Sequence, residues 1–235
     1  MAEPTLSWLG ASCIRLESAA GNVFYVDPWL ENPNCPPGER EPERVDVIAI
    51  THGHYDHLGE TLALAARFNP IVLAVTEMSS WLRAQDLGTT TIVPMNIGGS
   101  REVLDVRVSM TDARHSASIW LRGAATGIPA SAAGFVFELG VATVYVAGDT
   151  GPFLDMQLIE SMYRPDIAVL PIGDGTTMGP AGAAKALELL GASVCIPCHY
   201  DDPGYVGTPG ALQALTPVRV LAPEPGVRLP LADLR

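Results

Sequence analysis

The chain has 235 residues, of which 48% are hydrophobic, and it carries a formal net charge of −12 with Lys185 as its single lysine. This length and composition favour one large domain over residues 1–235 with a sizeable buried core. The acidic charge argues against nucleic acid as a partner, because the phosphates would be repelled. No apolar run approaches the roughly 18 residues that span a bilayer, and the first residues lack a secretory pattern. We therefore expect a cytoplasmic protein with no membrane partner.

Short β-type runs predict antiparallel strands in the first third of the chain, at Thr5 to Leu9, Cys13 to Ser18 and Val23 to Asp27. The proline-rich residues 31–44 have no periodicity and predict a flap or rim loop. The apolar run Val45 to Ile50 then predicts a buried strand. A histidine-rich stretch follows this strand directly.

Helix-type and strand-type segments alternate after residue 60. Helices are predicted at Thr61 to Phe68, Thr76 to Leu87, Pro152 to Tyr163 and Pro180 to Leu190, with Thr76 as an N-cap and Pro152 at a first helical position. Strands are predicted at Ile71 to Val75, Arg101 to Leu104, Val106 to Asp112, Phe135 to Leu139, Val141 to Ala147, Ile167 to Pro171 and Ser193 to Pro197. The alanine- and glycine-rich residues Gly123 to Gly134 predict a flexible connection. Together these segments imply an α/β (α+β) architecture in which helices cover sheets.

The histidine-rich stretch places four side chains that can bind a divalent metal within residues 52–57: His52, His54, Asp56 and His57. A neutral imidazole nitrogen is the commonest protein ligand for zinc-like ions. Gly53 and Gly59 would let the backbone turn tightly enough for these side chains to converge. A histidine-rich surface loop is the alternative. It is disfavoured because the chain has only five histidines, and the other two, His115 and His199, also follow strand-like runs.

Every candidate ligand follows a predicted strand: residues 52–57 follow Ile50, His115 follows Asp112, Asp149 follows Ala147, and His199 follows Pro197. Ligands in α/β architectures gather in loops beyond the carboxyl ends of strands. Five histidines and two aspartates could thus enclose two divalent ions, with Asp149 as a bridging carboxylate. The Gly-Asp-Thr sequence around Asp149 is weak evidence alone, because such a sequence often caps a helix.

The four cysteines are Cys13, Cys35, Cys195 and Cys198. Residues 195–199 match the C-x-x-C-H pattern of covalent haem attachment, but such attachment usually belongs to exported proteins. A redox dithiol and a pair of reduced thiols at the end of a strand are the other interpretations. Reduced thiols are what the cytoplasm favours.

The ordered set of His52, His54, Asp56, His57, His115, Asp149 and His199 resembles the ligands of the dinuclear metallo-β-lactamase superfamily. Further motifs resemble its branch of ascorbate-6-phosphate-lactonase-like proteins and their metal-dependent hydrolase relatives: Ser7-Trp8-Leu9-Gly10, Val26-Asp27-Pro28-Trp29, Met95-Asn96-Ile97-Gly98-Gly99, Ala147-Gly148-Asp149-Thr150 and Thr177-Met178-Gly179-Pro180. The likeness covers nearly the whole chain. It implies a four-layer αββα sandwich, in which two mixed sheets lie face to face with helices outside.

The resemblance also implies how the ligands divide. His52, His54 and His115 would hold a first metal, Asp56, His57 and His199 a second, and Asp149 would bridge them. Asp27 resembles a carboxylate that fixes an imidazole through its distal nitrogen, although a turn residue before Pro28 is an equal alternative. Two positions depart from the relatives: Gly175-Thr176 follows Asp174 where relatives often carry a histidine and an aromatic residue, and Cys198 stands where they often carry methionine.

The expected function is hydrolysis of a small, anionic ester, lactone or phosphodiester by a hydroxide formed at two divalent metal ions. Zinc or manganese is the expected metal, and iron is the alternative. Asp56 is the candidate catalytic residue, because it would orient the hydroxide or carry its proton. Arg114, Thr176 and Thr177 are candidate donors to the substrate.

Two other functions are kept as alternatives. One is an iron-dependent redox enzyme of the same fold, although His54 stands where oxygen-reducing diiron relatives usually carry glutamate. The other is a non-catalytic sensor that retains the metals. The sequence is compatible with a homo-oligomer and does not identify the substrate.

Overall fold

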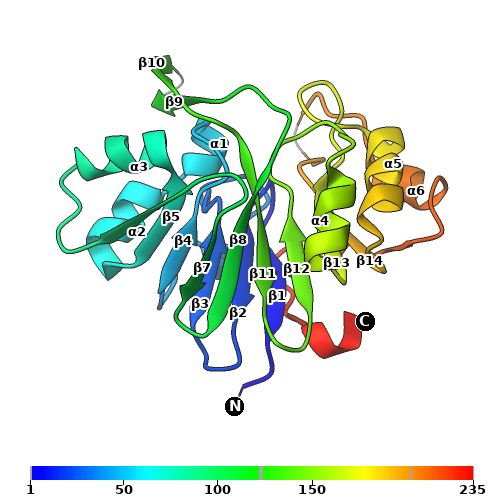
Figure 1. The fold of residues 1–235 in the computed structure, drawn as a ribbon, viewed down its shortest axis with the longest axis horizontal. Helices are drawn as coiled ribbons and strands as arrows, with labels where there is room; N and C mark the ends of the chain where they lie inside the picture. Colours follow the sequence, from blue (N-terminus) through cyan, green and yellow to red (C-terminus); the bar gives the residue numbers. More distant parts are fainter. Residues whose placement is uncertain (1, 122–123, 202, 235) are drawn as a thin grey trace.

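Two mixed β-sheets face each other in the computed structural model, and helices cover their outer faces (Figure 1). The structure describes residues 2–121, 124–201 and 203–234. The arrangement of layers is helix, sheet, sheet, helix. The predicted four-layer αββα sandwich is therefore confirmed.

The first sheet contains seven strands among the described residues, in the order β16-β1-β2-β3-β4-β5-β6. Their bounds are β16 Leu229–Pro230, β1 Thr5–Trp8, β2 Ile14–Glu17, β3 Val23–Val26, β4 Val47–Ala49, β5 Ile71–Val75 and β6 Thr91–Met95. Pairing is antiparallel from β16 to β3 and parallel from β3 to β6. Strand β6, which was not predicted, contains Pro94. Its edge position explains this, because an edge strand tolerates a residue that has no N–H to donate.

The second sheet also contains seven strands within the described part of the chain, in the order β15-β14-β13-β12-β11-β8-β7. Their bounds are β15 Arg219–Val220, β14 Val194–Cys198, β13 Ile167–Pro171, β12 Thr143–Val146, β11 Ala133–Glu138, β8 Val106–Asp112 and β7 Ser100–Val103. Pairing is antiparallel from β7 to β12 and parallel from β12 to β15. The hairpin predicted around Gly140 is the β11–β12 pair.

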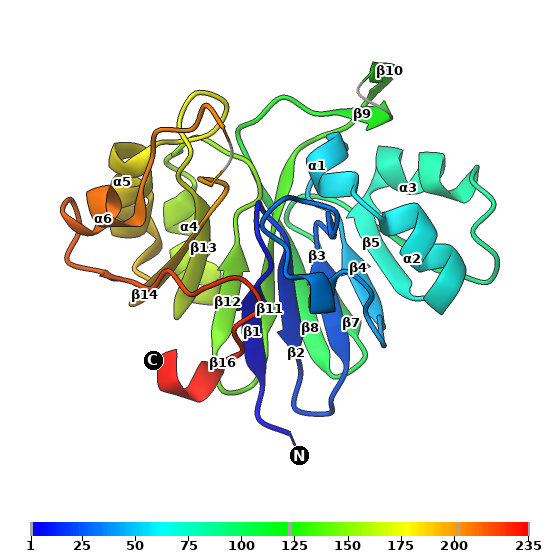
Figure 2. The same ribbon diagram turned by 180° about the vertical axis from the view of Figure 1, so that it is seen from behind.

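The helices lie in two groups, one on each sheet (Figure 2). Helices α2 (Thr61–Phe68) and α3 (Thr76–Arg83) cover the first sheet. Helices α4 (Met156–Tyr163), α5 (Pro180–Leu190) and α6 (Pro209–Gln213) cover the second. The remaining helical segments are short: α1 (Tyr55–Leu58), η1 (Pro37–Glu39) and η2 (Leu231–Leu234).

Side chains alternate between two apolar layers along the strands of the second sheet. On β11, Phe135 and Phe137 enter the core between the sheets, whereas Val136 enters the layer under α4 and α5. The same alternation holds on the other central strands, as the two-residue period of a strand requires. Phe24 of β3 meets Phe137 edge to face, with ring centroids 6.1 Å apart. The two sheets thus share one core, and the loops at their ends are held in a fixed relation.

Three predicted segments differ from the structure. Helix α3 ends at Arg83 rather than Leu87, because the N–H groups of Ala84 and Gln85 bond three residues back and tighten its last turn. Thr76 is its first residue, not its N-cap, and the Thr76 hydroxyl donates to the carbonyl of Met95. Helix α4 begins at Met156 rather than Pro152, after a similar three-residue turn.

The predicted flexible connection from Gly123 to Gly134 is wrong for most of its length. Strand β10 (Ala124–Pro129) pairs with β9 (Ser118–Leu121) in a small separate hairpin, and Ala133 and Gly134 already belong to β11. Gly123 itself lies outside the described residues. Alanine and glycine have low intrinsic strand propensity, so the pairing, and not the composition, makes these residues extended.

The predicted rim loop at residues 31–44 is partly core. Asn32 and Cys35 are buried, and the Asn32 side-chain amide donates to the carbonyl of Leu9 over 3.1 Å. All four cysteines are buried free thiols. In the described ranges, no helix combines the length and the apolar character that crossing a membrane requires.

Candidate metal centre

The stretch 52–57 leaves β4 and forms a tight loop that ends in α1. His54 precedes the helix, and its carbonyl accepts from the N–H groups of His57 and Leu58. Gly53 is needed for close approach: a Cβ there would lie 2.8 Å from the backbone of β9 at Ile119. Trp120 stabilises the same contact, because its backbone N–H donates to the carbonyl of Gly53 over 2.8 Å. The histidine loop and the β9–β10 hairpin are therefore packed backbone against backbone.

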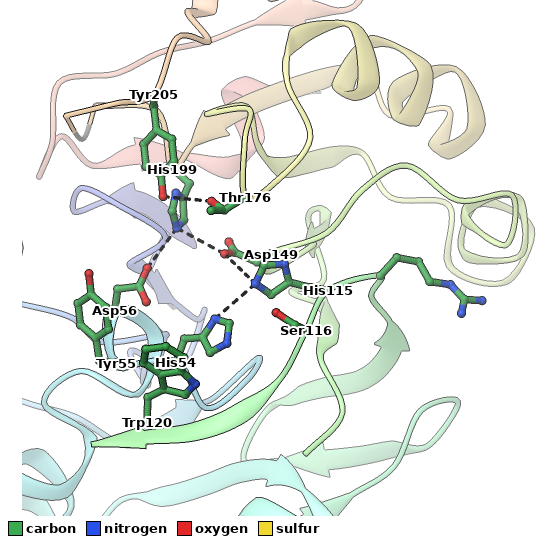
Figure 3. Close-up of a pocket in the computed structure, with 11 residues that line it drawn as sticks. His54, Tyr55, Asp56, His115, Ser116, Trp120, Asp149, Thr176, His199 and Tyr205 are labelled. Atoms are coloured by element: carbon green, nitrogen blue, oxygen red, sulfur yellow. Dashed lines mark hydrogen bonds and ion pairs between the residues drawn. The ribbon is translucent and has the colours of Figure 1, made fainter. Parts of the chain in front are cut away.

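The second sheet contributes the other candidate ligands from three strand ends. His115 and Asp149 each lie three residues beyond their strands, β8 and β12, and His199 follows β14 directly. His199 has a left-handed backbone with φ +54°, and its N–H donates to the carbonyl of Ala11 in the first sheet over 3.0 Å. The structure therefore brings all seven candidate ligands together at one end of the sandwich (Figure 3 shows five of them).

A first group is made of imidazoles alone. His52 Nε2 lies 2.9 Å from His54 Nδ1, and His115 Nε2 lies 3.4 Å from the same atom. The ring nitrogens of these three residues lie within 4.8 Å of one another. They match the division that the sequence resemblance implies for the first metal.

A second group mixes imidazoles with a carboxylate. The Nε2 atoms of His57 and His199 lie 3.6 and 3.3 Å from Asp56 Oδ2. Asp149 lies between the two groups, because its Oδ2 is 3.4 Å from His57, 3.5 Å from His199 and 3.6 Å from His115. A bridging position for Asp149 thus agrees with the geometry better than a helix cap does.

The spacing of these atoms suits metal ions. Ligands 2.0–2.1 Å from a tetrahedral zinc ion stand roughly 3.3 Å apart, close to the separations within both groups. Among the described residues, His57 Nε2 and Asp149 Oδ1 are buried and have no hydrogen-bond partner. An unsatisfied buried polar atom costs about 1–3 kcal/mol, which a bound cation would offset. His199 Nδ1 is a third unpaired atom of the donor set. The donor set, with the unpaired His57 Nε2 and Asp149 Oδ1, therefore fits a pair of divalent ions.

Asp27 supports the second group from behind. It follows β3 with φ +50°, and its Oδ2 lies 2.7 Å from His57 Nδ1. The same carboxylate accepts from the Thr51 backbone N–H over 2.8 Å and from the Thr51 hydroxyl over 2.6 Å. A carboxylate on Nδ1 fixes the ring so that Nε2 faces the centre of the cluster. The expected role of Asp27 thus has the right contact.

The electrostatics differ across the cluster. Burial lowers the pKa of His52 well below its ordinary value, and neighbouring imidazoles lower it further, which keeps this ring neutral. Burial also acts to lower the pKa of His57, but Asp149, Asp27 and Asp56 outweigh it and raise that pKa well above the ordinary range. These three carboxylates therefore favour a proton on His57. Metal binding would release this proton.

The cluster opens into a cavity of about 520 Å³, whose wall includes Tyr55, Ser116, Trp120, Thr176 and Tyr205. Of these residues, sequence reasoning singled out only Thr176. Trp120 was missed because β9 was not predicted. A signal was present, since Ser118 to Leu121 begins three residues after the ligand His115 and contains an aromatic residue. No comparable signal marked Tyr205, which lies among glycine and proline residues.

The remaining predicted residues have other partners. The Arg114 guanidinium lies 3.1 Å from Asp112 and 3.8 Å from Asp155 at the border of the cavity, and its contact with a substrate stays a prediction. The Thr177 hydroxyl donates to the carbonyl of Met178. Asp174 accepts from the N–H of Gly175 and borders a second cavity beside the first. Cys198 is part of the core between the sheets.

Comparisons with known proteins agree with this site. The family model of the beta-lactamase superfamily domain matches residues 22–200. A UPF0173 metal-dependent hydrolase of Koribacter versatilis is 39% identical over 216 residues, which cover 91% of each chain.

Solved structures agree as well. Igni18, a metallo hydrolase from the archaeon Ignicoccus hospitalis, is 28% identical, with a TM-score of 0.84 over 97% of this chain and 98% of that one. CmlA, a diiron beta-hydroxylase from Streptomyces venezuelae, shares the fold at 19% identity, with a TM-score of 0.66 over 85% of this chain and 45% of that one. The matched family model and the identity to the Koribacter protein together show that the chain belongs to the metallo-β-lactamase superfamily, among its metal-dependent hydrolases.

Proposed function

We propose that the chain hydrolyses a small ester, lactone or phosphodiester with two divalent ions held by the seven clustered ligands. One observation carries this proposal: two groups of three ligands lie side by side with the buried carboxylate of Asp149 between them. Such a pair of ions, when bound, supplies a hydroxide by lowering the pKa of water from 15.7 toward about 7 and polarises the electrophile.

The residues of the chain have distinct parts in this proposal. Asp56 borders the cavity, and its Oδ2 lies 3.3 Å from His199 Nε2. It is the acidic residue best placed to hold a proton from the attacking water, because Asp149 is more deeply buried and shared between the groups. Asp27 and Thr51 keep the ring of His57 oriented. His52, neutral and buried, offers its Nε2 without releasing a proton.

The metal is proposed to be zinc or manganese. Five imidazoles suit zinc, and the carboxylates of Asp56 and Asp149 also suit manganese. A lactonase-type activity follows from the resemblance to the ascorbate-6-phosphate-lactonase-like branch. A phosphodiesterase activity is its companion proposal, because bound divalent ions would supply the same chemistry for a phosphorus centre. The acidic composition supports a small-molecule substrate and argues against nucleic acid as a partner. A cytoplasmic location without a membrane partner is part of the same proposal.

The decisive experiment combines metal analysis with a substrate panel. Protein stripped with a chelator is reloaded with zinc, manganese or iron, and bound metal is measured by elemental analysis. We expect two equivalents per chain, and hydrolysis of at least one ester, lactone or phosphodiester with zinc or manganese. A stoichiometry of one, or oxidative turnover that needs iron and oxygen, would replace this proposal.

A further inference from the structure

Two aromatic side chains border the cavity at opposite ends of the ligand cluster (Figure 3). Trp120 of β9 packs edge to face on His54, with ring centroids 5.6 Å apart. Tyr205 packs in the same manner on His199, at 5.0 Å. His54 belongs to the first ligand group and His199 to the second. A substrate that reaches both groups therefore lies between the two aromatic rings.

Trp120 offers a substrate only its ring surface. Its indole N–H already donates to the Ser118 hydroxyl over 2.7 Å, and its backbone N–H donates to Gly53. The side chain is half-buried, so part of the ring faces the cavity. Burial of an apolar group against such a ring is favourable, and aromatic pairs gain further from their geometry.

Tyr205 lines the cavity on the side opposite Trp120 and is held there by close packing. A Cβ at Gly173 would lie 2.9 Å from its ring, and its hydroxyl pairs with Thr176 Oγ1 at 3.3 Å. Beyond it, a second cavity of about 420 Å³ shares Tyr55, Asp56, Thr176 and Tyr205 with the first. Tyr55, which packs edge to face on Trp29, adds a third aromatic side chain to the shared space.

The described residues that line the two cavities include no basic side chain, apart from the ligand imidazoles, that is without a carboxylate partner. An acidic substituent of a substrate would therefore meet no such cation. Apart from the ligand imidazoles, Arg114 is the only basic residue among the described residues that border either cavity. Its guanidinium pairs with Asp112 and Asp155 and stacks over Phe153 at 5.7 Å. A carboxylate or phosphate distant from the metals would face Asp174 instead. The part of the substrate outside the metal centre is therefore best uncharged.

We propose that the substrate carries an uncharged aromatic or branched apolar group that packs on Trp120, and that Trp120 selects for this group. This inference rests on the proposed hydrolase function and names the class of substrate for it. The negative charge expected for the substrate is then confined to the reacting group, at the ions. Tyr205 limits the size of the group from the opposite side.

The test uses three acetate esters that share one acyl group and differ in their alcohol: 2-phenylethyl, ethyl and 2-(4-carboxyphenyl)ethyl. Metal-loaded wild type is compared with Trp120→Ala, with Trp120→Phe, and with Leu121→Ala as a control on the same strand outside both cavities. We expect Trp120→Ala to lose about 10- to 100-fold in kcat/KM for the phenylethyl ester, mainly through KM. The ethyl ester should change less than about threefold, because it lacks the apolar group. Trp120→Phe should keep most of the selectivity, and Leu121→Ala all of it.

Equilibrium binding of 2-phenylethanol, measured by calorimetry, separates this inference from the proposed function. Binding that weakens in Trp120→Ala, with unchanged metal content, supports the aromatic site even if no ester, lactone or phosphodiester is turned over. Binding of this kind without any turnover would overturn the hydrolase proposal and leave the aromatic site standing. Undetectable binding in wild type, equal binding in both proteins, or a preference for the carboxylate-bearing ester would overturn the aromatic site.

Discussion

Each half of the molecule uses a seven-stranded mixed sheet to bring metal ligands to the same end of the sandwich, but the two halves place these ligands differently. Each sheet pairs antiparallel on one side and parallel on the other, and the change occurs at β3 in the first sheet and at β12 in the second. Asp27 follows β3 and Asp149 follows β12. The first half then places four ligands in one loop after β4. The second half places one ligand at each of three strand ends.

The first half thus gathers its ligands within one short segment, whereas the second half draws them from segments far apart in the sequence. The compact loop supplies its four ligands from six consecutive residues, and Asp27 and strand β9 hold it in place. The distributed ligands depend on the register of three strands and on the shared core. We expect a change at Asp149, in the second half, to affect both ion sites, and a change at Asp27, behind the loop of the first half, to affect one.

The largest effect is expected from Asp149→Ala. Its carboxylate lies within 3.6 Å of imidazoles from both groups, so its loss should release at least one metal equivalent. Activity should fall by more than about 100-fold, because even partners behind a metal ligand contribute 10- to 100-fold. The control is Cys198→Ala, a buried neighbour of a ligand. Elemental analysis and rate measurements on both variants test the difference, and equal metal content in the two would make Asp149 a helix cap.

Asp27→Asn should affect a single site. An amide can still accept from His57 Nδ1–H, but it lacks the charge that strengthens this contact, so affinity at the second group should fall about 10- to 100-fold. The first group should keep its ion. Asp46→Asn is the matched control, since Asp46 also accepts a backbone N–H in the same sheet, from Val23 over 2.8 Å. Competition titration with a chelating dye resolves the two sites. A parallel loss of both ions would show that the groups are not independent.

Gly53→Ala should displace the hairpin that lies on the histidine loop. The new Cβ would stand 2.8 Å from the backbone of Ile119 and Ser118, so we expect a loss of about 1–3 kcal/mol in the free energy of unfolding. Gly38→Ala, where a Cβ meets nothing within 4 Å, should change it little. Chemical denaturation measures both. An unchanged stability in Gly53→Ala would mean that the hairpin shifts at no cost.

The smallest effect concerns the end of the sandwich away from the metal centre. Asp105 accepts from Ser18 Oγ and Asn22 Nδ2, each over 2.8 Å, and from the N–H of Ala20, which ties the second sheet to the first. Its slight burial acts to raise the pKa, but these hydrogen bonds lower it below 3.8. The stabilisation is therefore present above about pH 3.8 and is lost as pH falls through the lower, folded-state pKa.

Asp105→Asn should thus cost a few tenths of a kcal/mol at pH 7, since the group is largely exposed, and less at pH 3. Urea unfolding at the two pH values provides the measurement. Glu102→Gln, which removes an exposed ion pair with Arg107 from the same β7–β8 hairpin, is the control for the loss of one surface charge. A cost that grows on acidification would contradict the direction of the pKa shift.

Much of this architecture could be predicted from the sequence. The apolar run around Val47–Ala49 and the strand ends before Asp149 and His199 carry strong local signals, so sheets covered by helices and a cluster of ligands were expected from the residues. The four-layer order of the sandwich was implied by the family resemblance. The strands that the sequence did not predict are stabilised by pairing with their neighbours rather than by the strand propensity of their own residues. The extended backbone of β10 is stabilised by β9, and two-residue strands such as β15 and β16 contain no periodicity. Trp120 is placed by the pairing of β9 with β10, and Tyr205 by its packing against Gly173, and neither contact is visible in the sequence.

Strand β16 carries a consequence for biosynthesis. It pairs with β1, Thr5 opposite Pro230, and the N–H of Leu231 donates to the carbonyl of Pro4. Once residue 95 has emerged from the ribosome, six strands of the first sheet are available to pair, yet one edge of β1 stays open until residue 230 emerges. An open edge is a template for pairing with other chains. The interval between the two events is thus when the nascent chain is most exposed to misassembly and most in need of a chaperone.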